Sequence, residues 1–436
     1  MDGEAASNIR IGWNKEATNS RRQCDVSGSI VLLSVDGSRK ALNDTEKDTE
    51  MVGQIALEMG TSVLVHGVPF GALLGTRFHS AQAKGIVSAV FGSQGDILNR
   101  NSIAYLLDVN ILPGMEGGAV LDQEQRLVGM VGEPIIASDV GAIFHLAWPI
   151  QHAIDLFGIK TKKIQKGTNE KKYQRNSSDR VSWNLSYAVV AVEDGGSWAS
   201  GLFLPDDGII LTNAHAIQTG IQGIGNEMRV YMPYQKRSFP VMLLHSFSKI
   251  LDLAVLKITG AYPSGTSIQN PDFKQDTIRK GISIIAAGFP LWRPSYPYQM
   301  FSALSKVKVT GGQITTVLYD NEHQVAAFTT NSKVINGSSG GPVFEHATGD
   351  VIGLITSNTK LLQHTFKERN TLSSEKTIFP CLNYCIPSNI LFAAVQAIKD
   401  GETDMFEHRL ERAGIPQLWQ SMDKYDLIEN AQNSKL

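Results

Sequence analysis

Short apolar runs separated by turn-forming residues make up most of the chain. This spacing is typical of strands in barrels or sandwiches, since βαβ folds would alternate such runs with long helical patterns. The clearest helical pattern begins near Pro387-Ser388 and repeats its apolar positions at Leu391, Phe392, Val395 and Ile398. The strand-like runs are 28–35, 62–66, 208–212, 228–232, 253–258, 282–286 and 351–355. The pattern predicts an all-β chain with few helices.

Several short motifs occur twice, in the same order, once in each half of the chain. The clearest pair is PGMEGGAV at Pro113–Val120 and NGSSGGPV at Asn336–Val343. The other pairs are Gly67–Pro69 with Gly288–Pro290, Ser88–Val90 with Ser305–Val307, Leu127–Gly129 with Val351–Gly353, and Trp148–Ile150 with Ile386–Ser388. An ordered internal repeat predicts that the two halves share a barrel.

The halves differ in how much chain precedes the first repeated motif. The stretch from Gly28 to Gly67 is far shorter than the stretch from Tyr187 to Gly288. The first half is therefore expected to hold one full barrel plus remnants.

A polar segment separates the two halves. Between Lys160 and Arg180 the chain carries eight basic and two acidic residues and almost nothing apolar. Such a segment cannot bury enough surface to order itself, so it is interpreted as a linker that is open to proteolysis, with a basic binding arm as the alternative. The predicted domains are a degenerate barrel domain at 1–159, a linker at 160–181, a second barrel-containing domain at 182–400 and a tail at 401–436.

Three motifs in the second half carry groups that could run covalent catalysis. They are LTNAHA at Leu211–Ala216, DLAVL at Asp252–Leu256 and GSSGGP at Gly337–Pro342. Each alone has an ordinary structural explanation: a histidine at a strand end, an aspartate that caps a turn, and a glycine-rich loop. Together, in the order His, Asp, Ser within one domain, they predict a catalytic triad.

The chemistry of these groups explains why they are needed together. A serine hydroxyl is a weak nucleophile, so Ser339 requires a base to take its proton, and His215 can both accept and donate one near neutral pH. Asp252 would hold the imidazole in one tautomer. The glycines would let the backbone N–H groups of Gly337 and Ser339 converge on the oxyanion of the tetrahedral intermediate.

Composition narrows the remaining classes of function. A formal net charge of −2 over 436 residues shows no excess of basic residues, so the sequence does not indicate nucleic-acid binding. No apolar run approaches the roughly 18–20 residues that span a bilayer, and the polar start lacks the features of a secretory signal. Three cysteines, Cys24, Cys381 and Cys385, form neither a disulfide framework nor a zinc site, which indicates a reducing, intracellular compartment. We expect no cofactor and no metal.

The last three residues, Ser434, Lys435 and Leu436, form a peroxisomal address, which a receptor reads at a free C-terminus. The alternative is an ordinary frayed end. If the address is used, the protein is expected in the peroxisome matrix, with the import receptor as a partner.

With these motifs, residues 182–400 resemble a trypsin-like serine protease of the disulfide-free HtrA/Deg type. Together with the terminal tripeptide and the degenerate first half, the whole chain resembles the peroxisomal (glyoxysomal) processing protease family. The resemblance implies a double β-barrel peptidase that removes N-terminal leaders from imported peroxisomal enzyme precursors, typically after a cysteine, and that cleaves itself.

The first half departs from a working protease. Glu116 stands in the place of the nucleophile, and none of its histidines, His66, His79, His145 and His152, has a setting like that of His215. We expect a pseudo-protease that serves substrate docking, inhibition or assembly, with self-association possible, or that gives plain structural support.

The first specificity pocket is expected between Asn331–Asn336 and Thr356–Asn358. Neither stretch carries an acid, so a preference for Arg or Lys is unsupported. The following polar stretch, Thr359–Thr377, is expected to gate the cleft or to be clipped. Two rival functions stay open at this point: a catalytically inactive binding or chaperone module, and a general intracellular peptidase.

Overall fold

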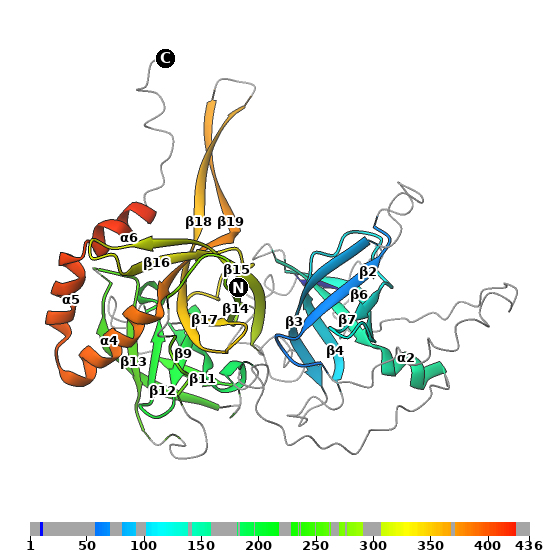
Figure 1. The fold of residues 1–436 in the computed structure, drawn as a ribbon, viewed down its shortest axis with the longest axis horizontal. Helices are drawn as coiled ribbons and strands as arrows, with labels where there is room; N and C mark the ends of the chain where they lie inside the picture. Colours follow the sequence, from blue (N-terminus) through cyan, green and yellow to red (C-terminus); the bar gives the residue numbers. More distant parts are fainter. Residues whose placement is uncertain are drawn as a thin grey trace, which may run out of the picture. The chain divides into compact units, whose positions relative to one another are not determined.

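The computed structural model describes residues 9–11, 57–69, 81–92, 102–137, 142–157, 181, 184–195, 197–217, 228–233, 235, 237–248, 250–260, 262, 270–274, 277–290, 307–367 and 371–423. The predicted linker, apart from its last residue Val181, and the terminal tripeptide lie outside these residues. The chain divides into two compact units, residues 1–174 and 175–436. Among the described residues, strands are the main regular elements of both units, as Figure 1 shows. The prediction of an all-β chain with few helices is confirmed in its main feature: the described residues are mostly β and form three six-stranded antiparallel barrels.

The second unit opens with a closed barrel in the strand order β10-β13-β12-β11-β8-β9. Its strands are β8 (Val189–Asp194), β9 (Ser197–Leu204), β10 (Ile209–Thr212), β11 (Arg229–Met232), β12 (Arg237–Ser246) and β13 (Ala254–Ile258). Strand side chains alternate between two faces, and the inward faces supply an apolar core that includes Val190, Phe203, Val230 and Leu256.

The second barrel of this unit closes in the order β14-β15-β16-β19-β18-β17. Its strands are β14 (Ser283–Gly288), β15 (Lys308–Tyr319), β16 (Val325–Thr330), β17 (Pro342–Glu345), β18 (Val351–Lys367) and β19 (Thr371–Pro387). The described residues of the predicted polar excursion, Thr359–Thr377, continue β18 and β19. Their backbones pair from Gly353–Pro387 to Lys367–Thr371, and Figure 1 shows the resulting ribbon projecting from the barrel.

Three helices follow the barrels: α4 (Ser388–Asp400), α5 (Thr403–Arg412) and α6 (Ile415–Asp423). The first of them confirms the helix predicted near Ser388. Residues 401–436 were predicted as a tail, but their first half folds. The Phe406 ring of α5 lies edge-on to Phe247 beside the first barrel, with ring centroids 5.4 Å apart, and Glu407 Oε1 lies 2.7 Å from His245 Nε2.

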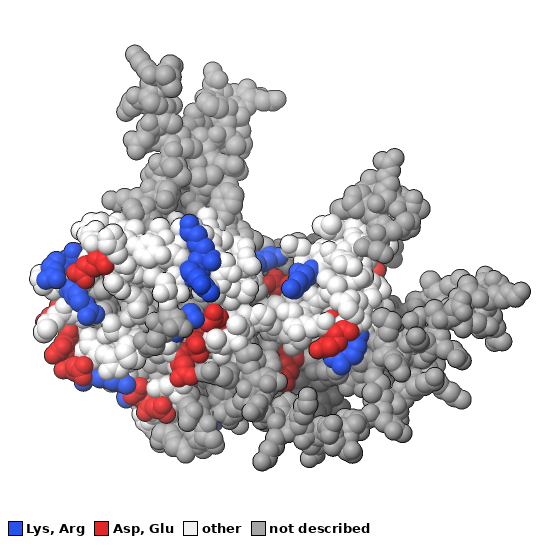
Figure 2. All heavy atoms as spheres, viewed as in Figure 1, with Lys and Arg blue, Asp and Glu red and all other residues white. Residues whose placement is uncertain are grey.

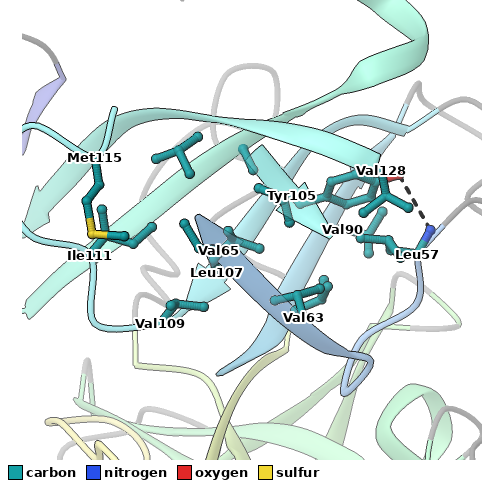
Figure 3. Packing of buried hydrophobic residues seen from close by; sticks show 14 residues of the cluster. Leu57, Val63, Val65, Val90, Tyr105, Leu107, Val109, Ile111, Met115 and Val128 are labelled. Carbon is teal, nitrogen blue, oxygen red and sulfur yellow. Dashed lines mark hydrogen bonds between the residues drawn. The ribbon is translucent and has the colours of Figure 1, made fainter. Parts of the chain in front are cut away.

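The first unit contains β1 (Ile9–Ile11), β2 (Ser62–Gly67), β3 (Ala81–Gly92), β4 (Ser102–Asp108), β5 (Ala119–Leu121), β6 (Leu127–Ala137), β7 (Ala142–Pro149) and α2 (Ile150–Phe157). A β6–β7 pairing closes β2–β7 into a barrel, and β1 adds to the edge of β6. Figure 3 shows its core, in which Val65, Tyr105 and Leu107 point inward and the Tyr105 hydroxyl accepts a hydrogen bond from the Leu57 amide at 3.5 Å.

This barrel repeats the second barrel of the second unit strand for strand, with β2–β7 corresponding to β14–β19. The registers agree as well. Val65 pairs with Val120 as Ala286 pairs with Val343, and Gly129 pairs with Pro149 as Gly353 pairs with Pro387. Each barrel even carries a register shift at the same point, between Val120 and Leu121 and between Val343 and Phe344. The internal repeat therefore reflects a shared barrel.

One of the repeated motifs was matched wrongly. Ser88–Val90 was paired with Ser305–Val307, but the strand registers place Val90 opposite Tyr105 and Val317 opposite Phe328, which are the equivalent positions. Val90 therefore corresponds to Val317. Three residues are too few to fix a register where the stretches of sequence between corresponding strands differ in length.

Basic and acidic side chains are interspersed on the face of the molecule drawn in Figure 2. The described residues on that face therefore present a mixture of both signs of charge.

Candidate active site

His215 and Asp252 meet because their strands pair. Strand β10 runs antiparallel to β13, with Thr212 opposite Ala254, so the residues just after β10 lie beside those just before β13. The Asp252 carboxylate accepts a hydrogen bond from the His215 backbone amide at 2.9 Å, and its Oδ2 lies 2.6 Å from Nδ1 of the ring. Asn213 Nδ2 also donates to the Asp252 carbonyl oxygen at 2.9 Å. The arrangement fixes the ring with Nε2 on the side away from the carboxylate.

The pair stands close to solvent. The side chain of His215 is 53% exposed and that of Asp252 is 28% exposed. A substrate can therefore reach the imidazole, while the carboxylate stays largely covered.

Ser339 sits in a tight turn that leads into β17. The amide of Ser338 donates to the Ile335 carbonyl at 3.0 Å, and that of Gly341 donates to the Ser338 carbonyl at 3.0 Å. The amide of Gly340 donates to the Ile355 carbonyl at 2.9 Å, which joins the turn to β18. These bonds hold the backbone on both sides of Ser339 in a fixed shape.

Two glycines make this turn possible. Gly337 and Gly340 have φ values of 90° and 78°, a left-handed region that other residues rarely adopt. Space is restricted too: a Cβ on Gly337 would lie 2.6 Å from Trp198 Nε1, and one on Gly340 would lie 2.4 Å from Thr212 Oγ1. Glycine is therefore required at both positions.

Ser200, in β9 of the first barrel, forms hydrogen bonds both to the serine turn and to the residue after β14 of the second barrel. Its amide donates to the Ser339 carbonyl at 2.8 Å, and its hydroxyl donates to the Gly337 carbonyl at 2.7 Å. The same hydroxyl accepts from the Phe289 amide at 2.8 Å. Sequence reasoning missed Ser200, because one hydroxyl inside a strand forms no recognisable pattern.

These contacts bring the serine turn to the His–Asp pair. Gly340, the neighbour of Ser339, packs against Thr212 and Asn213, with its hypothetical Cβ 3.1 Å from the Asn213 amide nitrogen. His215 follows Asn213 by two positions. The three residues predicted as a triad therefore lie at one junction between the two barrels.

Among the described residues, two amides of the serine turn donate to no backbone carbonyl. The amides of Ser338, Gly340 and Gly341 all donate to carbonyl oxygens. Within the described part of the chain, those of Gly337 and Ser339 have no backbone acceptor. They are the pair predicted as oxyanion donors.

The first unit keeps the same turn but fills it differently. Gly114 and Gly117 have φ values of 93° and 79°, close to those of their counterparts in the serine turn. Glu116 stands where the second unit has serine, and its Oε2 accepts a hydrogen bond from the Gly114 amide at 2.7 Å. This amide is the counterpart of the Gly337 amide. The Glu116 carboxylate therefore accepts from the Gly114 amide, whereas the equivalent Gly337 amide has no backbone acceptor among the described residues.

Among the described residues, no cluster of His, Cys, Asp or Glu could hold a metal ion. No helix in the same residues has the length and apolar character of a membrane span.

Comparison with known proteins finds a similar domain and similar whole proteins. Residues 199–354 match the model of the trypsin-like peptidase domain, a stretch from β9 to β18 that includes all three positions of the predicted triad. The chain is 23% identical to the human peroxisomal leader peptide-processing protease, in an alignment that covers 94% of this chain and 68% of that protein. It is 31% identical to the mouse protein of the same name, in an alignment that covers 23% of this chain and 15% of that protein.

Similar solved structures include a serine endoprotease from Yersinia pestis, with 22% sequence identity and a TM-score of 0.35; the match covers 51% of this chain and 67% of that one. Another is an inactive mutant form of Rv3671c from M. tuberculosis H37Rv, with 15% sequence identity and a TM-score of 0.34; the match covers 50% of this chain and 88% of that one. By sequence, residues 199–354 are therefore similar to trypsin-like peptidase domains, and most of the chain is similar to the human peroxisomal leader peptide-processing protease.

Proposed function

We propose that the chain is a serine endopeptidase in which Ser339 is the nucleophile, His215 the general base and Asp252 the residue that orients the base. The observation that carries this proposal is that the Asp252 carboxylate binds His215 twice, beside the serine turn. Its Oδ1 accepts from the His215 backbone amide at 2.9 Å, and its Oδ2 lies 2.6 Å from Nδ1 of the ring. A carboxylate on Nδ1 favours the tautomer in which Nε2 can accept a proton.

In the first half of the reaction, the Ser339 hydroxyl oxygen attacks the carbonyl carbon of the scissile bond and its proton passes to Nε2 of His215. The carbonyl oxygen becomes an oxyanion, which accepts hydrogen bonds from the Gly337 and Ser339 amides. Collapse of the tetrahedral intermediate breaks the C–N bond, and the leaving amine takes the proton from His215.

In the second half, His215 removes a proton from water, and the resulting hydroxide attacks the ester carbonyl of the acyl-enzyme. The oxyanion forms again in the same place. When it collapses, the ester C–O bond breaks and the Ser339 oxygen recovers its proton from His215.

The proposed substrates are precursors of peroxisomal enzymes, from which the protein removes N-terminal leaders, and the proposed compartment is the peroxisome matrix. Two observations support this: the similarity to the human peroxisomal leader peptide-processing protease over 94% of the chain, and the terminal Ser434-Lys435-Leu436. Self-cleavage and binding of the import receptor through the tripeptide belong to the same proposal. The polar linker at 160–181 is the proposed place for self-cleavage, because it has the composition of a nicking site.

The proposed role of the first unit is non-catalytic. Its turn carries Glu116 in place of a serine, and the carboxylate accepts the bond from the Gly114 amide. With no serine nucleophile, acyl transfer cannot begin there. Substrate docking, inhibition and assembly through self-association are the roles that suit such a unit.

Labelling with a fluorophosphonate probe tests the catalytic assignment, because only an activated serine forms the phosphonyl ester. Wild-type protein should be labelled and the Ser339→Ala variant should not. Ser338→Ala is the matched control, since it removes the neighbouring serine hydroxyl and should leave labelling intact. Labelling of Ser339→Ala, or none of the wild type, would remove the proposed nucleophile.

The substrate assignment needs a second experiment. A peroxisomal precursor with its leader is incubated with wild-type or Ser339→Ala protein, and the new N-termini are mapped. Cleavage at one site by the wild type alone supports leader processing. Scattered cleavage would instead indicate a general peptidase. For the compartment, a variant that lacks the final three residues should stay in the cytosol while the full chain enters peroxisomes.

A further inference from the structure

Ser200 of β9 is fully buried beside the serine turn, and its hydroxyl has one partner on each side. The hydroxyl oxygen accepts a hydrogen bond from the Phe289 amide at 2.8 Å. Because a carbonyl can only accept, the hydroxyl proton must point at the Gly337 carbonyl, 2.7 Å away. The hydroxyl therefore has one orientation, and it links the residue after β14 to the serine turn.

The surroundings of this hydroxyl are fixed as well. A Cβ on Gly288 would lie 2.6 Å from Ser200 Oγ, so glycine is the residue that leaves room for the hydroxyl. The indole nitrogen of Trp198, two positions earlier in β9, donates to the Phe289 carbonyl at 3.1 Å. Strand β9 thus holds Phe289 at both its amide and its carbonyl, and the partner of the Ser200 hydroxyl has no freedom to move.

Ser200 also holds the two peptide groups on either side of the Ser339 amide. Its hydroxyl donates to the Gly337 carbonyl, which belongs to the peptide group before Ser338. Its own amide donates to the Ser339 carbonyl at 2.8 Å, which belongs to the peptide group before Gly340. The peptide group between these two carries the Ser339 N–H, one of the two proposed oxyanion donors. With both neighbours held, this group cannot rotate without disturbing a hydrogen bond to Ser200.

The other proposed donor, the Gly337 N–H, depends on a flexible residue. Glycine adopts positive and negative φ with similar ease, so the backbone at Gly337 can rotate more freely than at residues with a side chain. Gly337 joins the peptide group that carries its own N–H to the peptide group that Ser200 holds. The hydrogen bond from Ser200 therefore fixes one side of this flexible joint.

The first unit makes the same turn without such a hydroxyl. Gly114 has a φ of 93°, and its amide donates to the Glu116 carboxylate at 2.7 Å. Met115 packs against Gly67, at the glycine where the second unit has the Ser200 hydroxyl. The turn therefore folds without a hydroxyl, held from within by its own carboxylate. The second unit has no such carboxylate, and its turn is held from outside by Ser200.

We propose that Ser200 is a positioning residue for the oxyanion donors: acting through the Gly337 carbonyl, its hydroxyl keeps the Gly337 and Ser339 amides aimed at one point. This inference rests on the proposed peptidase function. Negative charge forms at that point in the transition state and is nearly absent from the substrate carbonyl. Loss of the hydroxyl should therefore weaken binding of the transition state much more than binding of the substrate.

Steady-state hydrolysis of a peptide that wild-type protein cleaves measures this difference. Ser200→Ala should lower kcat by about 10- to 100-fold, because the donors lose their alignment, and should change KM by less than about threefold. A peptide boronic acid forms a tetrahedral adduct with Ser339, and its affinity should fall by the same factor as kcat/KM. An unchanged kcat, or a rise in KM that accounts for the whole loss, would overturn the inference.

Ser388→Ala is the matched control. Its hydroxyl is also buried but donates to the Lys274 carbonyl, at the start of α4. This change should lower stability somewhat and leave kcat and KM as they are. If Ser200→Ala does not fold, Ser200→Cys fills nearly the same space with a much weaker donor and repeats the test. It should show the same fall in kcat at a nearly constant KM, and a folded Ser200→Cys with the kcat of wild type would count against the proposal.

Fluorophosphonate labelling separates the two levels of failure. Wild type that neither labels nor hydrolyses the peptide refutes the peptidase proposal itself. In Ser200→Ala, labelling should still occur at Ser339 but more slowly, because the oxygen on phosphorus occupies the oxyanion position. Equal labelling rates and equal kcat in wild type and Ser200→Ala would refute only the role of Ser200.

Discussion

Asp252 holds His215 at two points at once: one carboxylate oxygen accepts the backbone amide at 2.9 Å, and the other lies 2.6 Å from Nδ1 of the ring. The carboxylate therefore fixes both the turn that carries the histidine and the orientation of its imidazole. The two functions can be separated by substitution. An amide in place of the carboxylate can keep an acceptor for the backbone while it presents an NH₂ group to the ring.

We expect Asp252→Asn to fold normally and to lose activity. The NH₂ group would favour the tautomer with the proton on Nε2, which cannot accept the serine proton, and the expected loss in kcat is about 10⁴-fold. Peptide hydrolysis under steady-state conditions measures it. Asp207→Asn, at a surface ion pair with Lys399, serves as control and should keep full activity. Near-normal hydrolysis by Asp252→Asn would contradict the proposed role.

Gly340→Ala is expected to disable the site by displacement. The added Cβ would lie 2.3 Å from the Ser200 carbonyl oxygen and 2.4 Å from Thr212 Oγ1, so the serine turn must move away from the first barrel. A shift of about 1 Å costs roughly 100-fold in rate. Gly401→Ala is the matched control. Gly401 has a similar φ of 72° but open space around its Cβ position, so the change should cost only about 1–2 kcal/mol of stability and no activity.

The sequence predicts the parts of this molecule whose chemistry restricts the choice of residue. The turn around Ser339 needs glycine at positions with positive φ, and its counterpart around Glu116 keeps the same glycines. For this reason the two turns were recognisable as a repeat, and the shared barrel followed from them. The short Ser88–Val90 motif carries no such restriction, and its match was wrong.

Other features leave no local signal in the sequence. Ser200 joins the two barrels through its hydroxyl and backbone, yet it looks like any small residue in a strand. Helix α5 buries only Phe406 and Leu410, so its sequence looked like a polar tail. Both depend on partners that are distant in the chain, which patterns within a short window cannot reveal.

The first unit should stay inactive even with a serine in its turn. Glu116→Ser, made in the Ser339→Ala background, removes the carboxylate from the Gly114 amide and supplies a hydroxyl. No histidine in that half has the setting of His215, so the new serine lacks a base. We expect no fluorophosphonate labelling. The Ser339→Ala protein and wild type are the negative and positive controls, and labelling of the double variant would show that the unit retains a base.

The helices after the barrels should be essential for stability. The ring of Phe406 contacts that of Phe247, and the Asn321 amide donates to the Ala413 carbonyl at 3.0 Å, so the segment touches both barrels of the second unit. Phe406→Ala should lower the free energy of unfolding by about 3–5 kcal/mol. Urea unfolding measures it. Met405→Ala, at an exposed position in the same helix, is the control and should change stability little.

Truncations test the same point in another way. A chain that ends after residue 423 keeps all three helices and should retain activity in vitro. One that ends after residue 400 loses α5 and α6 and should unfold or lose activity. Equal behaviour of the two chains would show that residues 401–423 act as a dispensable tail.

Cys385 should make the protein less stable in alkaline solution. Burial raises the pKa of its thiol far above the ordinary value, because the charged thiolate would lose its hydration. In the unfolded chain the thiol ionises near pH 8.5. Its contribution to stability is therefore complete below that pH and is lost as the pH rises toward the folded-state pKa.

The expected slope is a loss of about 1.4 kcal/mol per pH unit above pH 9, relative to a variant that has no thiol at this position. The comparison is Cys385→Ala, whose overall stability is lower because a buried atom is removed. Only the difference in slope between pH 9 and 10 is diagnostic, since other groups titrate equally in both proteins. Parallel curves would mean that the native thiol ionises as readily as the unfolded one, and the buried position assigned to Cys385 would then be wrong.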